Sequence, residues 1–281
     1  MSEQVVVGVD GSASGFDAVA WAADDAFRME VPLRAVCVVE TWPYQVPQIP
    51  APEWEDSLSA HAREVLAKAE EIVRERRPTV EMSTDVMSGT PSVALRELAG
   101  QAAELVVGSK GAGGFAGAVL GSVSMNVAGQ APGPVVVVRG GAGTNGEVAV
   151  GVDGSPGCEN ALAYAFRQAA LRHSRLRAVY AWPLPFALAP DFSCDLEALR
   201  QSHQRVARDQ LAPWQARHPD VTVIADVHSG HPVKSLAAAG DRADLLVVGS
   251  HGRSGLGSIV LGSVSRGVLH HARCTVAVVR A

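Results

Sequence analysis

Short apolar runs alternate with longer stretches of helical periodicity along the whole chain. Runs rich in Val and Leu are typical of strands buried on both faces of a parallel sheet. They predict strands over residues 5–9, 33–39, 80–86, 105–107 and 135–138, and again over 148–152, 176–181, 221–227, 245–248 and 276–279. The pattern therefore predicts five strands in each half of the chain.

The stretches between these runs carry apolar residues at i, i+3 and i+4, the spacing of one helix face. They predict helices over residues 17–29, 53–77, 91–100 and 122–130, and over 159–172, 196–217, 232–239 and 263–271. Strands and helices that alternate with right-handed crossovers form an α/β fold with a doubly wound parallel sheet. Ligands of such sheets bind beyond the carboxyl ends of the strands, where the strand order reverses.

The second half of the chain repeats the first. Gly-Val-Asp-Gly-Ser at 8–12 returns at 151–155, and Gly-Ser-x-Gly at 108–111 returns at 249–252. In both halves nine residues separate the second string from Gly-Ser-Val-Ser, at 121–124 and 262–265. We therefore predict a tandem duplication with domains at 1–140 and 147–281, joined by a glycine-rich segment.

The repeated glycine motif has the chemistry of a phosphate cradle. Glycines after a strand let main-chain N–H groups approach an anion, and the free N–H groups at a helix start favour phosphate. A single such pattern is weak evidence because glycine often only shapes turns, but its repetition after a strand in both halves is strong evidence. The candidate residues are Gly108, Ser109, Gly111, Gly121, Ser122, Val123 and Ser124 in the first half, and Gly249, Ser250, Gly252, Arg253, Gly262, Ser263, Val264 and Ser265 in the second.

Asp10 and Asp153 each end an apolar strand and precede Gly-Ser, at Gly11-Ser12 and Gly154-Ser155. A carboxylate at this point suits hydrogen bonds from a nucleoside, or a metal-bound water. The alternative is a helix N-cap, a role that fits Ser12 and Ser155 better. Lys110 and Arg253 are either phosphate contacts or solvated loop charges, and the sequence leaves both open.

Other chemistry finds less support. His228 and His231 have a spacing that binds metal on a helix, but the first half has Met87 and Thr90 there, which favours a structural or solvent-facing role. Neither a G-x-S-x-G elbow nor a P-loop G-x4-G-K-[ST] motif occurs. Hydrolase and P-loop interpretations therefore lose their main support.

Charge and composition narrow the partners and the compartment. The formal net charge of −5 and the lack of a basic stripe argue against nucleic-acid binding. The first half is net negative and the second net positive, which either favours docking of the halves or reflects drift after duplication. The four scattered cysteines, the lack of a signal peptide and the lack of a long apolar run predict a cytosolic protein with no membrane partner.

These motifs resemble those of the universal stress protein family, in its ATP-binding branch with the pattern G-x2-G-x9-G-[ST]. The likeness covers nearly the whole chain and includes V-x-x-G-x-P at 86–91 and 227–232 and the final valine-rich strand of each half. The resemblance implies two Rossmann-like domains of strand order 3-2-1-4-5, each with ATP and Mg²⁺ in its crevice. It also implies adenosine contacts from Asp10 and Val38, and from Asp153 and Ala181. The departures from the pattern are Ala112, where the second half has Arg253, and Thr275, where the first has Pro134.

Three functions follow from these observations. The first is an ATP-binding stress or regulatory protein, in which nucleotide occupancy alters conformation or partner binding. The second is a slow ATPase or phosphotransferase, which the lack of a clear general base paired with a nucleophile weakens. The third is a nucleotide-free dimerisation scaffold in which the glycines only shape turns. The valine-rich edge strands at 135–138 and 276–279 need cover and are expected to pair within the chain, and a homodimer is left open.

Overall fold

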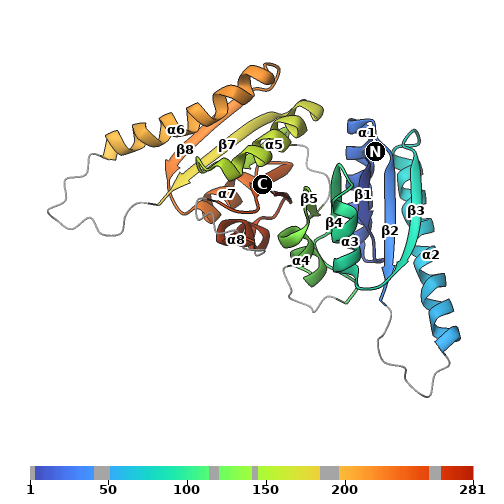
Figure 1. The fold of residues 1–281 in the computed structure, drawn as a ribbon. Coiled ribbons are helices and arrows are strands. Elements are labelled where there is room, and N and C mark those ends of the chain that lie inside the picture. Colours follow the sequence, from blue (N-terminus) through green and yellow to red (C-terminus); the bar gives the residue numbers. More distant parts are fainter. Residues whose placement is uncertain are drawn as a thin grey trace. The chain divides into compact units, whose positions relative to one another are not determined.

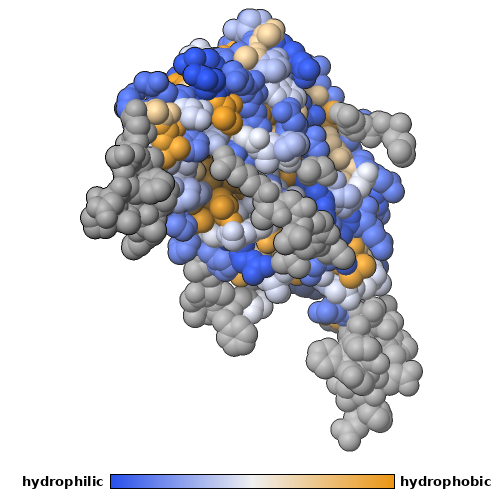
Figure 2. All heavy atoms as spheres, turned by 60° about the vertical axis from the view of Figure 1, so that its left-hand side comes forward, coloured by the Kyte–Doolittle hydropathy of each residue, from blue (hydrophilic) through white to orange (hydrophobic). Residues whose placement is uncertain are grey.

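The structure is a computed structural model, and it describes residues 4–40, 51–113, 120–140, 145–183, 196–252 and 261–280. The chain divides into two compact units, Met1–Gly141 and Ala142–Ala281. Among the residues that the structure describes, no helix combines the length and the apolar composition needed to cross a membrane. On the face shown in Figure 2, hydrophilic residues cover most of the surface and hydrophobic ones form small groups.

The two units repeat the same order of elements (Figure 1). The first contains β1 (Val5–Gly8), α1 (Ala13–Met29), β2 (Leu33–Val39), α2 (Ala51–Arg76), β3 (Met82–Ser88), α3 (Pro91–Ala99), β4 (Glu104–Gly108), α4 (Ser122–Gln130) and β5 (Val135–Val138). The second contains β6 (Glu147–Gly151), the 3₁₀ turn η1 (Pro156–Cys158), α5 (Glu159–Leu171), β7 (Arg175–Trp182), α6 (Leu196–Arg217), β8 (Val223–Ser229), α7 (Pro232–Gly240), β9 (Leu245–Gly249), α8 (Ser263–His271) and β10 (Thr275–Val279).

All the strand pairs within a unit are parallel. In the first unit β1 pairs with β2 and β4, and the order is β3-β2-β1-β4-β5. In the second, β6 pairs with β7 and β9, and the order is β10-β9-β6-β7-β8. The α/β class with parallel strands is therefore confirmed. Chain order reverses between β1 and β4, and between β6 and β9, so each unit has a switch point at its first strand.

Helices cover both faces of the strands of each unit, which explains the apolar runs. In the first unit α1 packs beside α2 and α3 beside α4, and in the second α5 packs beside α6 and α7 beside α8. Val5, Val6 and Val7 of the central strand β1 are at most 1% exposed. The outer strands β3 and β8 differ, because each of their residues is either half-buried or exposed, and Val86 is 38% exposed. The expectation that every strand is buried on both faces was therefore wrong for these two.

Several element boundaries also differ from the sequence pattern. β3 and β8 begin two residues later than predicted, because Val80 and Val221 each donate their N–H to a carbonyl three residues earlier, in a turn. α1 begins at Ala13, four residues early, because the Ser12 side chain accepts the Gly15 N–H at 3.0 Å and caps the helix. The amphipathic pattern misses this first turn because it holds Ser and Gly rather than apolar residues.

One buried carboxylate fastens α1 to the end of α2. Asp24 is 4% exposed, and its two oxygens accept hydrogen bonds from Arg76 at 2.7 Å and from Arg77 at 2.8 Å. Burial by itself raises the pKa of Asp24, but the hydrogen bonds and positive charges of the arginines outweigh it and lower the pKa below the ordinary value of 3.8. The two ion pairs of Asp24 therefore stabilise the folded state as long as this carboxylate is ionised.

We expect Asp24→Asn to lower the free energy of unfolding at pH 7 by roughly 1–3 kcal/mol, because the variant leaves two arginine hydrogen bonds without a charged acceptor. A group whose folded-state pKa is lowered stabilises the fold above its unfolded pKa, and this contribution is lost as the pH falls through the folded value. Urea unfolding at pH 7 and at pH 3 measures both effects. The difference between the wild type and the variant should shrink at pH 3, and an unchanged difference contradicts the assignment.

Candidate functional site

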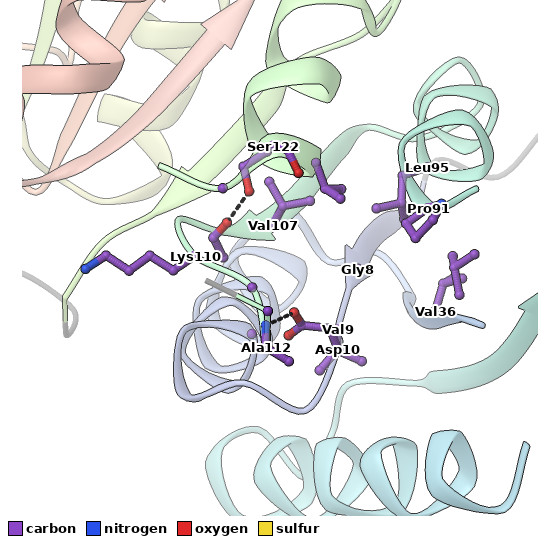
Figure 3. Close-up of a pocket in the computed structure, with 18 of the residues that line it drawn as sticks. Gly8, Val9, Asp10, Val36, Pro91, Leu95, Val107, Lys110, Ala112 and Ser122 are labelled. Atoms are coloured by element: carbon purple, nitrogen blue, oxygen red, sulfur yellow. Dashed lines mark hydrogen bonds between the residues drawn. The ribbon is translucent and has the colours of Figure 1, made fainter. Parts of the chain in front are cut away.

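A cavity of about 610 Å³ lies at the carboxyl ends of the strands of the first unit, at the switch point between β1 and β4. Its volume falls within the range of small-molecule pockets, roughly 300–1,000 Å³. Its walls come from the ends of β1, β2 and β4, the start of α3 and the start of α4 (Figure 3). The lining residues are Gly8, Val9, Asp10, Gly15, Val36, Val38, Glu40, Pro91, Leu95, Val107, Gly108, Lys110, Gly111, Ala112, Gly113, Leu120, Gly121, Ser122, Val123 and Ser124.

The three motif glycines of this cavity serve different purposes. A Cβ on Gly108 would lie 2.5 Å from the main-chain oxygen of Ser14, so the end of β4 approaches the first turn of α1 too closely for any side chain. A Cβ on Gly111 would lie 3.0 Å from an oxygen of Asp10. By contrast, a Cβ on Gly121 would make only ordinary contacts, the nearest at 3.5 Å. Contacts within the protein thus exclude a side chain at Gly108 and crowd one at Gly111, whereas Gly121 has room for a methyl group, and all three glycines line the cavity.

Asp10 organises the loops at the mouth of the cavity. One carboxylate oxygen accepts hydrogen bonds from the Ser12 N–H at 3.0 Å and the Ser12 hydroxyl at 2.6 Å, and the other accepts the Ala112 N–H at 2.8 Å (Figure 3). The N-cap of α1 is Ser12, as the sequence favoured, and not Asp10. Asp10 therefore braces the segment that follows β4 while its carboxylate remains part of the cavity wall.

A second brace comes from Ser14, which the sequence did not single out. Its hydroxyl donates to the Lys110 carbonyl and accepts the Lys110 N–H at 3.2 Å. The only sequence signal for this contact is the hydroxyl-rich run Gly-Ser-Ala-Ser at 11–14. Asp10 and Ser14 together hold the first residues after β4 against the start of α1.

The start of α4 forms the polar end of the cavity. Gly121 is its N-cap, with φ −73° and ψ 151°, and donates its N–H to the Ser109 carbonyl at 2.7 Å. The Ser124 hydroxyl is used inside the protein, since it donates to the Gly108 carbonyl at 2.6 Å. The helix has no side-chain cap. The main-chain N–H groups of its first turn, at Ser122 and Val123, therefore border the cavity without intrahelical partners.

The opposite end of the cavity is apolar. Figure 3 shows Val36, Pro91 and Leu95 on one side, while Lys110 extends on the other. Leu95 packs against the bare backbone of Gly8, where a Cβ would lie 2.9 Å from its Cδ1. Of this wall the resemblance implied only Val38. Pro91 and Leu95 were not named as site residues. Pro91 is the last residue of the V-x-x-G-x-P motif, and Leu95 lies one helical turn after it.

The second unit has an equivalent cavity of about 360 Å³. Asp153 accepts the N–H and the hydroxyl of Ser155, and a Cβ on Gly252 would lie 2.7 Å from its other oxygen. Gly262 caps α8 and donates to the Ser250 carbonyl at 2.8 Å. The lining residues are Gly151, Val152, Asp153, Cys158, Val179, Tyr180, Ala181, Pro183, Pro232, Leu236, Val248, Gly249, His251, Gly252, Gly262, Ser263, Val264 and Ser265.

The two cavities differ at the helix that follows the first strand. In the second unit a 3₁₀ turn, η1, precedes α5, and Cys158 lines the cavity where the first unit has Gly15. Burial, with the charge of Asp153, raises the pKa of the Cys158 thiol to about 12, so this thiol is not a nucleophile near neutral pH. His251 takes the position of Lys110. The second cavity thus has a smaller volume than the first and is lined by different polar groups.

Most of the expected site residues come together in these cavities. Those that line them are Asp10, Val38, Gly108, Gly111, Gly121, Ser122, Val123 and Ser124 in the first unit, and Asp153, Ala181, Gly249, Gly252, Gly262, Ser263, Val264 and Ser265 in the second. Those that do not are Gly11, Ser12, Ser109, Gly154, Ser155 and Ser250. Ser155 precedes η1 but makes no side-chain cap hydrogen bond. Arg253 lies outside the described residues.

Fold and site together define a duplicated, doubly wound α/β protein with a ligand-sized cavity at the switch point of each unit. A model of the universal stress protein family matches residues 1–139 and 145–280. The chain is 37% identical over 286 aligned residues to universal stress protein Rv2005c of Mycobacterium tuberculosis (strain ATCC 25618 / H37Rv), with 98% of this chain and 96% of that protein covered. The chain therefore belongs to the universal stress protein family.

A second relative and a solved structure are also similar to this chain. A universal stress protein of Mycolicibacterium smegmatis is 32% identical over 284 aligned residues, with 98% of this chain and 96% of that protein covered. Among solved structures, a universal stress protein from Archaeoglobus fulgidus DSM 4304 has a TM-score of 0.71 at 21% identity, covering 100% of this chain and 97% of that one. The last likeness concerns the fold alone.

We expect Gly108→Ala to destabilise the protein by roughly 1–3 kcal/mol, because its methyl group would overlap the Ser14 carbonyl and the backbone must shift. Gly121→Ala is the matched control. Its methyl group fits, and only the loss of a favourable N-cap residue remains, about 1 kcal/mol or less. Urea unfolding midpoints of the two variants test this difference. Equal midpoints, or a greater loss for Gly121→Ala, contradict the close approach at Gly108.

Proposed function

We propose that the protein binds ATP in the cavity of each unit and acts as a nucleotide-dependent regulatory stress protein. The observation that carries this proposal is the two-ended character of the first cavity. One end offers apolar side chains, and the other offers bare glycine backbone and the open start of a helix. A nucleotide has the same two ends, a flat base and an anionic phosphate chain.

The start of α4 supports the phosphate end. Helix N-termini bind anions because their N–H groups lack intrahelical partners and carry a partial positive charge. α4 has a glycine N-cap whose missing side chain leaves these groups accessible, and its first turn carries no acidic residue that would compete with an anion. Lys110 adds an exposed positive charge beside the same wall. The phosphate chain of ATP would lie between Gly111 and this helix start.

The apolar wall supports the base end. Val36, Val38 and Leu95 come from β2 and α3 and present flat hydrocarbon surface to the cavity. Asp10 lies between the two ends, and its carboxylate already accepts three hydrogen bonds from the protein. A carboxylate has about four lone-pair sites, which leaves one for a ribose hydroxyl. This role agrees with adenosine contacts from Asp10 and Val38.

Magnesium would arrive with the nucleotide. Among the described residues there is no group of three or more His, Cys, Asp or Glu side chains placed to hold a metal ion. Mg²⁺ does not need such a group, because it is usually held by one or two carboxylates, water and substrate phosphates. In the first cavity Asp10 and Glu40 are the lining carboxylates. We propose that phosphate oxygens and water supply most of the ligands.

Binding rather than turnover is the proposed activity. Hydrolysis needs a base that activates water close to the terminal phosphate. Among the described residues that line the first cavity, the ionisable side chains are Asp10, Glu40 and Lys110, and Asp10 is engaged in bracing the loops. We also propose a cytosolic location and association through the edge strands, as the sequence led us to expect.

We expect Gly121→Asp to abolish most ATP binding in the first unit while leaving the fold intact or slightly more stable. Asp is a favourable N-cap residue, so α4 gains a cap, but its carboxylate occupies the N–H groups and repels phosphate. Losing hydrogen bonds to a charged group costs roughly 2–3 kcal/mol, which is roughly a 30- to 150-fold weaker affinity. Gly262→Asp is the corresponding change in the second unit.

Calorimetric titration with MgATP reports affinity and stoichiometry. The wild type should bind up to two equivalents, each Asp variant should lose one, and Gly121→Ala should keep both, because its methyl group makes only ordinary contacts and carries no charge that competes with phosphate. An ATP affinity that is unchanged in both Asp variants would remove the helix starts from the proposal. A wild-type protein without ATP affinity would favour the scaffold interpretation, and ATP hydrolysis that is lost in the Asp variants would favour the enzyme.

A further inference from the structure

Asp226, His228 and Ser235 form a hydrogen-bonded chain on the outer part of the second unit, apart from the lining of its cavity. The Asp226 carboxylate lies 2.9 Å from His228 Nδ1, and His228 Nε2 lies 2.8 Å from the Ser235 hydroxyl oxygen. Asp226 and His228 lie on the edge strand β8, and Ser235 lies in the first turn of α7. The sequence had favoured a structural or solvent-facing role for His228, and did not place Ser235 beside it.

The two hydrogen bonds indicate where the protons lie. An ionised carboxylate only accepts hydrogen bonds, so His228 Nδ1 carries a hydrogen and donates to Asp226. In the neutral ring the other nitrogen then has a lone pair, and Nε2 accepts the proton of the Ser235 hydroxyl. This is the arrangement in which a histidine acts as a general base toward a serine nucleophile.

The charge near Asp226 leaves it able to hold the histidine. Arg177 lies 3.4 Å from the other oxygen of Asp226, but its closest carboxylate is Glu147, at 2.6 Å from its Nε. Glu147 is 2% exposed and provides both of its oxygens to Arg177. Arg177 and His228 meet different oxygens of Asp226, so the oxygen that faces the histidine remains available to it.

The surroundings of Ser235 give access and a candidate oxyanion site. Gly230 lies beside the hydroxyl, and a Cβ there would lie 3.1 Å from the Ser235 oxygen and 3.5 Å from His228 Cδ2. The bare backbone thus leaves an approach to the serine. α7 has no side-chain cap, and the main-chain N–H groups of Val233 and Lys234 in the same turn lack intrahelical partners. Such groups can stabilise an oxyanion next to the serine.

The first unit provides a natural comparison. The pairing of β2 with β3 places Val38 opposite Met87, and the pairing of β7 with β8 places Ala181 opposite His228, so Met87 and His228 are equivalent. The fourth residue of α3 is Ala94, where α7 has Ser235. The first unit keeps the acid, Asp85, with its arginine partner Arg34, but lacks base and nucleophile. The complete chain of three residues occurs in the second unit, which shows that the fold does not need it.

We propose that Ser235 is a nucleophile for acyl transfer from small carboxylic esters, with His228 as its general base and Asp226 as the positioning residue. The Ser235 oxygen forms a bond to the acyl carbon, its proton passes to His228 Nε2, and the bond from the acyl carbon to the alkoxy oxygen breaks as the leaving alcohol takes that proton. Water then attacks the acyl-serine, giving its proton to His228, and the carboxylic acid leaves as Ser235 regains a proton. Because His228 is 41% exposed, the site is open and suits small or protruding acyl groups.

The test uses the full chain, a small alkyl fluorophosphonate and p-nitrophenyl acetate. The fluorophosphonate forms an oxygen–phosphorus bond on an activated serine and releases fluoride. Peptide mass spectrometry should place the adduct on Ser235, and the wild type should hydrolyse the ester. Ser235→Ala should abolish both reactions, and His228→Met should slow both by on the order of 100-fold, the usual contribution of a general base.

Both variants carry the residue of the first unit at that position, so we expect them to fold, and thermal unfolding checks this. His231→Thr, made on the same principle at the exposed neighbouring histidine, is the control and should react like the wild type. An adduct elsewhere, no adduct at all, or equal rates in the wild type and a folded His228→Met variant would overturn the proposal. These readouts need no nucleotide, so they stand apart from the ATP titration.

Discussion

The close approach between the end of β4 and the first turn of α1 determines the shape of the first cavity. At Gly108 the backbone passes so near the Ser14 carbonyl that no side chain fits. The same contact brings Lys110 within reach of the Ser14 hydroxyl and Ala112 within reach of Asp10. These bonds set the direction in which the chain leaves the sheet. Ser109 can then receive the Gly121 N–H, which aims the start of α4 at the cavity.

The second unit meets the same constraint with a different first turn. There Gly157 takes the position of Ser14, and a Cβ on Gly249 would lie 3.4 Å from the Gly157 carbonyl and 3.2 Å from that of His251. Pro156 opens a 3₁₀ turn instead of an α-helical one, and Cys158 fills space that Gly15 leaves open. The contact is looser than the one at Gly108, and Cys158 is one of the side chains that line the smaller second cavity. Two clefts with the same helix start thus differ in the room they give a ligand.

Much of this architecture could be predicted from the sequence because it depends on local patterns. The buried valine runs and the helical periodicity place the strands and helices, and α6 has the predicted bounds, Leu196–Arg217. The first turn of α1 was missed because capping by Ser12 leaves no apolar signal. The late starts of β3 and β8 were missed because the valines before them belong to turns.

The site was harder to predict, for a physical reason. A glycine required by a ligand and one required by a neighbouring backbone look the same in a sequence, since both exclude Cβ. Only the structure separates Gly121, where a Cβ would make ordinary contacts, from Gly108, where a Cβ would overlap the Ser14 carbonyl. Leu95 and Ser14 were not singled out because their roles depend on contacts between segments far apart in the chain. Spacing within a motif carries no information about such contacts.

The differences between the two units follow from where the fold tolerates change. Central strands are covered on both faces, so a polar substitution there would be buried without partners at a cost of several kcal/mol. The outer strands β3 and β8 are partly exposed, and polar residues there remain in contact with water. Met87 and His228 can therefore occupy equivalent positions without loss of the fold. The Asp226–His228–Ser235 chain thus uses an outer strand of its unit, where the fold accepts polar side chains.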